Sequence, residues 1–299
     1  MSDRPVIATE MLSKSYGKHR GVVDVSLEVQ PGEVFGFLGP NGAGKTTTIR
    51  ILMDLIRPSG GSARVFGLDA RSEGPEIRAR TGYLPGELAL YDHLTGEDHL
   101  RFLANLRNQP ARNTVALAER LGADLSRKIS ELSKGSKQKI GLIQAFMGTP
   151  ALLVLDEPTG GLDPLMQHEV HGLISEASRE GRTVFLSSHN LPEVEALCDR
   201  VGIIREGRLI TVEHIDTLKA HALRRLEIHF AGAVEASEFA ALPGVQDVVS
   251  ADGVVRCTVV GDLDAVVKAA ARHPVVNVLS HEPTLEEIFL AYYEQPDAP

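Results

Sequence analysis

The chain has 299 residues, of which 43% are hydrophobic and 24% charged, a composition that excludes a fibrous or disordered protein. Its formal net charge of -9 argues against a general nucleic-acid binder, because such proteins carry a basic surface. No apolar run approaches the roughly 18 residues of a membrane-spanning helix, and the first residues lack an export signal.

The first part of the chain alternates between apolar runs and helical patterns. Residues 22–29 alternate in polarity, which predicts a half-buried strand with Val23, Val25, Leu27 and Val29 on its buried face. Residues 34–38 are a short apolar run, typical of a strand buried on both faces, and a helix over about 46–55 follows it. Residues 152–155 and 183–187 predict two more such strands. The fold class is therefore α/β, with a mostly parallel sheet covered by helices.

The middle of the chain, about 85–150, offers helical patterns in place of strands, near 96–106, 114–121 and 136–147. We expect a helical subdomain inserted in a first domain that covers residues 1–220. The remaining residues, 221–299, differ in charge, since from residue 220 onward 5 Lys and Arg stand against 12 Asp and Glu. Their patterns predict a small α+β domain of ferredoxin-like order, with elements at 226–230, 235–242, 245–249, 254–260, 263–271, 275–279 and 284–293.

A glycine-rich segment, GPNGAGKT over Gly39–Thr46, separates a predicted buried strand from a predicted helix and fits the P-loop pattern. Glycines let the backbone N–H groups turn onto phosphate oxygens, and the N-terminus of the helix adds its positive dipole end. Lys45 would reach the β- and γ-phosphates of a nucleotide, and the Thr46 hydroxyl would ligate Mg²⁺. The motif predicts a nucleotide-binding protein, but it does not show to which class of P-loop protein the chain belongs.

Two other predicted strands end in polar side chains. The strand at 152–155 is followed by Asp156 and Glu157, of which the first suits a water-mediated hold on Mg²⁺ and the second can act on a water beside the γ-phosphorus. His189 follows the strand at 183–187, at the sheet edge where ligands bind in open α/β folds. There it could hydrogen-bond the γ-phosphate or the attacking water.

Over about residues 5–215 the ordered motifs resemble the ATP-binding subunits of ABC transporters. GPNGAGKTT resembles Walker A and LLVLDEP resembles Walker B; Glu157 then corresponds to the catalytic base and His189 to the switch histidine. Asp163 lies in a segment similar to the D-loop, and Tyr16 resembles the aromatic residue that stacks on adenine, a task that suits a flat ring. The resemblance implies ATP binding by Gly39, Pro40, Asn41, Gly42, Ala43, Gly44, Lys45, Thr46 and Thr47.

The segment LSKGS, with Ser133, Lys134 and Gly135, resembles the signature motif of ABC ATPases. In that family the motif reaches across a dimer to the γ-phosphate held by the partner's P-loop. Two positions depart from the family pattern: Lys134 replaces the middle glycine and Ser136 replaces the terminal glutamine. A lysine is compatible with a phosphate contact.

The segment TGYLP, at residues 81–85, resembles the approach to the Q-loop, but Gly86 occupies the position of the metal-ligating glutamine. Two alternatives remain open. Either the next residue, Glu87, supplies an oxygen ligand, or Mg²⁺ keeps an extra water, as it readily does.

Together with the tail PTLEEIFLAYY (283–293), these motifs look like the ATPases of bacterial drug- and antibiotic-export systems. The resemblance implies that residues 1–220 form an ATP-binding domain, an ATPase with ATP and Mg²⁺ that works as a homodimer or as a heterodimer with a paralogue. It would power export of a drug, antibiotic or lipid-like compound through a separate membrane permease that docks around Gly86–Gly96. The subunit is then expected on the cytoplasmic face of the membrane. Two alternatives are a soluble ABC ATPase without a transport role and an ATP-gated regulatory module.

Overall fold

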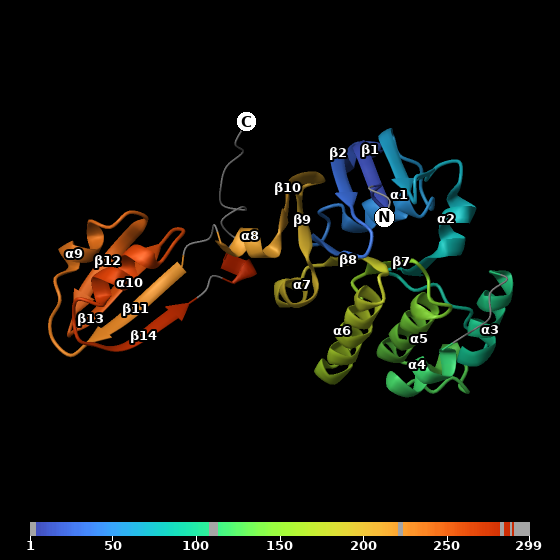
Figure 1. Cartoon of the computed structure of the whole chain (residues 1–299). Helices are drawn as coiled ribbons and strands as arrows, with labels where there is room; N and C mark the ends of the chain where they lie inside the picture. Colours follow the sequence, from blue (N-terminus) through green and yellow to red (C-terminus); the bar gives the residue numbers. More distant parts are fainter. Residues whose placement is uncertain (1–3, 108–112, 221–223, 282–283, 288, 290–299) are drawn as a thin grey trace. The chain divides into compact units, whose positions relative to one another are not determined.

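The computed structural model describes residues 4–107, 113–220, 224–281, 284–287 and 289. The chain forms two compact units, residues 1–212 and 213–299 (Figure 1), whereas the sequence placed the boundary at residue 220. Of the final helix expected over 284–293, only 284–287 and 289 lie within the described residues, and 285–287 and 289 are helical.

The first unit alternates strands and helices. Its strands are β1 (Ile7–Tyr16), β2 (His19–Val29), β3 (Val34–Leu38), β4 (Gly60–Val65), β5 (Leu68–Asp69), β6 (Thr81–Leu84), β7 (Leu152–Asp156), β8 (Thr183–Ser188), β9 (Arg200–Arg205) and β10 (Arg208–His214). Its helices are α1 (Lys45–Leu52), α2 (Gly74–Arg80), α3 (Gly96–Leu106), α4 (Thr114–Arg120), α5 (Lys134–Phe146), α6 (Pro164–Arg179), α7 (Leu191–Leu197) and the short 3₁₀ helix η1 (Ile129–Glu131).

The central sheet has the order β10-β9-β3-β8-β7-β6. β3 pairs in parallel with β8 and β9, and β7 pairs in parallel with β8 and β6. Every residue of β3, β7 and β8 is buried, as the continuous apolar runs predicted. The predicted α/β class is confirmed, and the parallel strands bring their carboxyl ends to one edge of the sheet.

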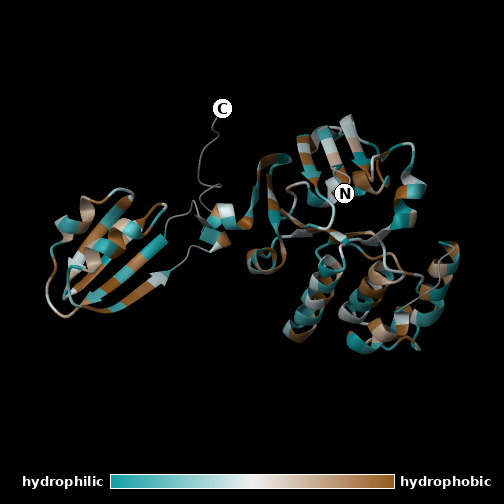
Figure 2. Cartoon of the chain, in the orientation of Figure 1, coloured by the Kyte–Doolittle hydropathy of each residue, from teal (hydrophilic) through white to brown (hydrophobic). Residues whose placement is uncertain are grey.

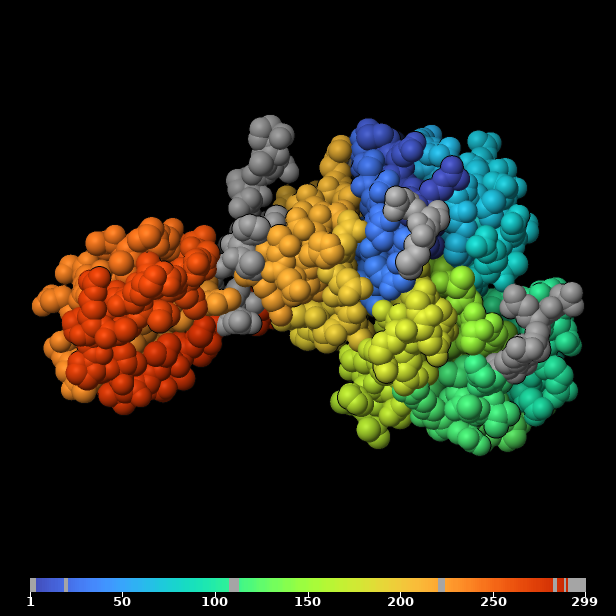
Figure 3. All heavy atoms as spheres, in the orientation of Figure 1, coloured from blue at the N-terminus to red at the C-terminus, as the bar shows by residue number. Residues whose placement is uncertain are grey.

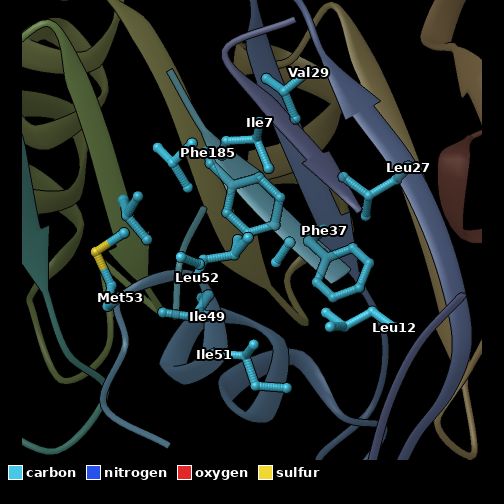
Figure 4. Packing of buried hydrophobic residues seen from close by; sticks show 14 of the residues in the cluster. Ile7, Leu12, Leu27, Val29, Phe37, Ile49, Ile51, Leu52, Met53 and Phe185 are labelled. Atoms are coloured by element: carbon cyan, nitrogen blue, oxygen red, sulfur yellow. The ribbon is translucent and has the colours of Figure 1, made fainter. Parts of the chain in front are cut away.

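A second, antiparallel sheet of order β2-β1-β4-β5 encloses the core from the other side. In Figure 4, side chains from β1, β2, β3, β8 and α1 point toward one another, and Phe37 lies 5.6 Å from Phe185 between ring centroids. Burial of each such side chain contributes about 1.5–3 kcal/mol. Because α1 supplies Ile49 and Leu52 to this core, the helix is held firmly behind the glycine-rich loop.

The alternation expected for β2 is wrong at its start. Val22 is buried and Val23 is half-buried, although Val23 was expected on the buried face. The reason is local, because Asp24 adopts a left-handed backbone with φ of 53° and shifts the phase of the strand by one residue. From Val25 onward the predicted alternation is present.

Helices α3, α4 and α5 form a group of their own beside α6, coloured green in Figure 1. Thr95 caps α3 by accepting a hydrogen bond from the backbone N–H of Asp98. The Arg120 guanidinium joins α4 to α6, since it lies 2.9 Å from a carboxylate oxygen of Glu169 and 2.6 Å from one of Glu176. Figure 3 shows the green atoms of this group beside the yellow-green atoms of the α6 region.

The second unit contains α8 (Ile215–Ala220), β11 (Arg224–Phe230), α9 (Ala236–Ala240), β12 (Val245–Ala251), β13 (Val254–Val259), α10 (Asp264–Ala270) and β14 (Val275–His281). Its antiparallel sheet has the order β12-β13-β11-β14. From β11 onward the element order is ferredoxin-like, as the sequence predicted. Hydropathy alternates along β11 (Figure 2), and Phe239 packs at the centre of the small core. No helix within the described ranges is long and apolar enough to cross a membrane.

Candidate nucleotide-binding site

The site begins where three strands end at the same level of the sheet. In register, Phe37 of β3 lies opposite Ser187 of β8, and Ser187 lies opposite Asp156 of β7. The glycine-rich loop, Glu157 and His189 follow these aligned residues by one or two positions. Topology alone therefore brings together three segments that are far apart in the sequence, at the edge where open α/β sheets bind ligands.

The glycine-rich loop needs its glycines. Gly42 and Gly44 have φ values of 80° and 112°, which residues other than glycine rarely adopt. A Cβ on Gly44 would also lie 2.7 Å from Cγ1 of Val22. Gly44 caps α1 without offering a side chain to its N–H groups, so these donors remain for a ligand. Such an arrangement suits a phosphate group.

Lys45 is 6% exposed and its ammonium lies over the loop. Its Nζ donates to the carbonyl oxygens of Gly39 at 2.5 Å and Pro40 at 3.2 Å, and lies 3.3 Å from a carboxylate oxygen of Glu157. A pocket of about 220 Å³ opens beside it, lined by Tyr16, Gly21, Pro40, Asn41, Gly42, Gly44, Lys45, Thr46, Thr47 and Glu157. Ala43, within the loop, is buried and does not line this pocket.

Glu157, which lines this pocket, contacts His189. Nδ1 of His189 lies 2.7 Å from Oε2 of Glu157, while the other carboxylate oxygen faces Lys45. The backbone of Glu157 is left-handed, with φ of 53°, a conformation that costs a non-glycine residue of order 1–3 kcal/mol. Strain of this kind gathers at functional sites, and here it directs the carboxylate toward both basic groups.

Asp156 is fully buried behind Glu157. Its Oδ1 accepts a 2.5 Å hydrogen bond from the Ser187 hydroxyl, but its Oδ2 has no hydrogen-bond partner among the described residues. Burial, together with the Asp156 charge, raises the pKa of Tyr83 to about 12 and keeps that phenol protonated. An orphaned carboxylate oxygen is costly unless a cation or a water meets it, so Asp156 fits a magnesium ion.

Thr46 lines the pocket beside Lys45, which agrees with the metal-binding interpretation. Within the described ranges, no group of three or more His, Cys, Asp and Glu side chains could hold a metal ion by itself. A magnesium ion at this site would therefore take most of its ligands from phosphate oxygens and water, which is its usual preference.

The Q-loop position packs closely against Asp156. A Cβ on Gly86 would lie 3.0 Å from Asp156 Oδ2, a tight contact, so the backbone of Gly86 adjoins the orphaned oxygen. Glu87 is 90% exposed and its carboxylate lies 3.5 Å from the Arg50 guanidinium on α1. Between the two alternatives from the sequence, this arrangement favours a water beside Gly86.

Tyr16 lines the pocket from the end of β1, with its side chain 45% exposed. Lys14 Nζ lies 5.2 Å from the ring centroid. Gly21 gives the ring room, because a Cβ there would lie 2.9 Å from Tyr16 Cε2. The ring is thus placed where a base attached to a phosphate in the loop can stack on it.

The signature-like residues lie elsewhere. Ser133 and Lys134 are exposed at the start of α5, where Ser133 caps the helix by accepting from Ser136 N–H at 3.2 Å. Asp163 caps α6 in the same way. Ser133, Lys134, Gly135 and Asp163 do not line the pocket that holds Lys45. Within one chain, the predicted site residues therefore form two separate groups, one around Lys45 and one at the starts of α5 and α6.

Sequence reasoning missed two residues that hold the site. Ser187 binds Asp156 through its hydroxyl, and Gln138 of α5 donates to the backbone carbonyls of Glu157 and Pro158. In the sequence, Ser187 is a serine at the end of an apolar run, and Gln138 is a glutamine on the apolar face of a helix. Neither pattern predicts a hydrogen-bond partner that is distant in sequence.

Comparison with known proteins gives consistent matches to one family. Residues 22–160 match the ABC transporter family. The chain is 38% identical over 226 residues to the bacitracin transport ATP-binding protein BcrA of Bacillus licheniformis, covering 74% of each chain. It is 32% identical over 268 residues to a fluoroquinolones export ATP-binding protein of Mycobacterium tuberculosis, covering 87% of this chain and 83% of the relative. A solved ATP-binding subunit of an ABC transporter superposes with a TM-score of 0.66 at 32% identity, covering 72% of this chain and 92% of that one.

Proposed function

The chain belongs to the ABC transporter family as an ATP-binding subunit that hydrolyses ATP, and we propose that it powers export of an antibiotic or drug-like compound through a separate membrane permease. The relatives named for bacitracin transport and fluoroquinolones export support the substrate class. The observation that carries the catalytic part is the convergence of Lys45, Glu157 and His189 over the glycine-rich loop.

Hydrolysis follows from the placement of these side chains. Lys45 and the loop N–H groups bind the β- and γ-phosphates, and Tyr16 stacks on the adenine. A water between Glu157 and the γ-phosphorus attacks in line while its proton passes to the Glu157 carboxylate. The bond from phosphorus to the β–γ bridging oxygen breaks, which releases phosphate and ADP. His189 donates to the Glu157 carboxylate through Nδ1, and when both ring nitrogens carry a proton it also donates to a γ-phosphate oxygen through Nε2.

Magnesium is part of this proposal. When bound, Mg²⁺ neutralises charge on the β- and γ-phosphates. The Thr46 hydroxyl would ligate it directly, and Asp156 Oδ2 would hold it through a water. That oxygen is buried and has no hydrogen-bond partner in the described part of the chain, and this observation supports the role.

Two copies, or one copy and a paralogue, are needed to complete each site. The pocket beside Lys45 lacks the signature residues, while Ser133 and Lys134 are exposed at a helix N-terminus, the kind of position that suits phosphate. We therefore propose that Ser133, Lys134 and Gly135 of one subunit bind the γ-phosphate held by the other subunit, with Asp163 at the interface.

A permease surface is available on the helical subdomain between Gly86 and Gly96. Tyr91 is 44% exposed and packs edge-on against Phe102 of α3, with ring centroids 5.3 Å apart. Phe102 is equally exposed. An exposed pair of aromatic rings suits contact with a partner protein, and we place the membrane subunit here. Binding to this face would localise the subunit to the cytoplasmic side of the membrane.

The catalytic assignment is tested by Glu157→Gln, measured by phosphate release. The amide keeps the size of the side chain but cannot accept the proton, so we expect turnover to fall by about 10²-fold or more while ATP binding persists. Glu180→Gln is the matched control, because Glu180 lies at the far end of α6, where its carboxylate is 2.9 Å from the Arg182 guanidinium. Undiminished hydrolysis by Glu157→Gln would refute the assignment.

A further inference from the structure

The catalytic carboxylate belongs to a residue whose backbone is held from two sides. The Glu157 N–H lies 3.1 Å from the carbonyl oxygen of Ser187 and 3.3 Å from its hydroxyl, both on β8. On the other side, the Glu157 carbonyl accepts hydrogen bonds from the backbone N–H of Gly160 at 3.1 Å and from Gln138 Nε2 at 3.4 Å. Because φ of Glu157 is 53°, these contacts decide where its carboxylate points.

Gln138 differs from the other holding groups because it comes from the helical subdomain. Its side chain is 8% exposed, and the same Nε2 donates to the Pro158 carbonyl at 3.1 Å. The amide thus spans two successive carbonyl oxygens of the segment that follows β7. A buried donor with two acceptors is a specific contact, since without it the Pro158 carbonyl would lose the Gln138 N–H and the Glu157 carbonyl would keep only the Gly160 N–H.

The same helix carries the signature turn. Ser133 caps α5 and Gln138 lies five residues further along, which is about 7.5 Å of helix axis. The two segments also approach closely at Gly135, where a Cβ would lie 3.2 Å from the Gly161 carbonyl oxygen. A displacement of the signature turn therefore reaches the backbone of Glu157 through a short and rigid path.

We propose that Gln138 is a positioning residue for Glu157, joining the turn that contacts the partner's nucleotide to the base that hydrolyses this subunit's own nucleotide. The second half of this statement rests on the proposed two-subunit function; the positioning of Glu157 rests on contacts within one chain. Gln138 does not touch ATP in this scheme, so it acts on the hydrolysis step rather than on binding.

The experiment replaces the amide by an apolar group of similar length. Gln138→Met is expected to lower kcat for ATP hydrolysis about tenfold or more and to change the KM for ATP less than twofold. Gln144→Met is the matched control, because Gln144 lies on the same helix but contacts His99 within the helical subdomain, 3.2 Å away. Gln138→Glu is a second variant of equal size that faces the carbonyls with acceptors, and its kcat is expected to be as low or lower.

A second readout separates positioning from support of the signature turn. In a Glu157→Gln background, Gln138→Met should leave ATP-driven dimerisation unchanged. A kcat within twofold of the unmodified protein, an equal loss in Gln144→Met, or a loss of dimerisation in Gln138→Met would each overturn the proposal. If Glu157→Gln dimerises neither alone nor with a paralogue, the two-subunit function is wrong, and the kcat comparison still decides whether Gln138 positions Glu157.

Discussion

The two units of this chain build their sheets differently, and their carboxylates differ as a consequence. In the first unit β3, β7 and β8 are wholly buried, so the groups at their ends are partly shielded from water. In the second unit every residue of β14 is exposed, and Glu227 of β11 stands opposite Arg256 of β13. A buried sheet can leave a carboxylate unsatisfied for a ligand, whereas an open sheet gives its carboxylates local partners.

Glu227 and Asp156 illustrate the contrast. Glu227 lies on β11, 2.8 Å from the Arg256 guanidinium of the neighbouring strand, and the hydrogen bond to Arg256 lowers the pKa of Glu227. The negative charge of Glu227 is therefore paired with a positive charge within the sheet. Asp156 keeps one oxygen without a partner among the described residues. Of these two carboxylates, only Asp156 is expected to respond to a cation. We therefore expect metal binding and ATP hydrolysis in the first unit.

The largest expected effect tests whether the units fold separately. Phe239 is fully buried in the second unit and lies 6.0 Å from Phe230 between ring centroids. Phe239→Ala should destabilise that unit by about 3–5 kcal/mol and leave ATP hydrolysis by the first unit unchanged. Denaturant unfolding followed by circular dichroism, beside a phosphate-release assay, measures both. A tenfold loss of hydrolysis would show that the units are coupled.

The next effect concerns the orphaned oxygen. Asp156→Asn removes the negative charge that would hold Mg²⁺, and loss of such an outer ligand typically costs about 10- to 100-fold in metal affinity or activity. We expect hydrolysis to fall by that factor while the melting temperature without nucleotide does not fall, since a buried charge is removed. Titration with Mg²⁺ and thermal denaturation check the two parts. Glu227→Gln is the matched control, and it should leave hydrolysis unchanged.

A smaller effect is expected at the adenine position. Tyr16→Ala removes the half-exposed ring from the pocket and should weaken ATP binding about fivefold, or about 1 kcal/mol, because base stacking on an aromatic ring is worth about that much. Tyr16→Phe keeps the flat face and should bind ATP normally. Equilibrium binding of a fluorescent ATP analogue distinguishes the variants. Equal affinities for the Ala variant and the unmodified protein would exclude stacking.

The smallest effect is on acid stability. His99 is 1% exposed, and burial lowers its pKa below the usual 6.5. The unfolded chain therefore takes up a proton at this histidine before the folded chain does, and its contribution to stability is lost as pH falls below about 6.5. A single proton limits the slope to about 1.4 kcal/mol per pH unit. His99→Gln should flatten the loss of melting temperature between pH 7.5 and 5.5; an unchanged slope would contradict this.

The sequence predicted the elements whose signals are local. The runs at 34–38, 152–155 and 183–187 became β3, β7 and β8 almost residue for residue, because a fully buried strand has a continuous apolar pattern. β1 gave no such signal, since Met11 has φ of 46° and the alternation breaks there. α6 was missed although Asp163 and Pro164 form a recognisable start, because its exposed polar residues mask the apolar stripe.

The residues of the candidate site also fall into those that the sequence predicts and those that it does not. The glycine-rich loop, Asp156, Glu157 and His189 could be found because each follows a strand that the sequence predicts. Ser187 and Gln138 could not, since their partners lie 31 and 20 residues away and become neighbours only through the sheet and helix packing. The left-handed backbone of Glu157 was equally invisible, because nothing in the residue type indicates it.

The most direct measurement is the mass of the Glu157→Gln protein in solution, by light scattering, with saturating ATP and Mg²⁺. Completion of each pocket by the signature turn of a second subunit predicts that the 32.3 kDa chain becomes a dimer with ATP and stays a monomer with ADP. A paralogue requirement would show as dimerisation only after the second chain is added. A protein that remains at the monomer mass with ATP bound, alone and with its permease and paralogue present, would contradict the shared site.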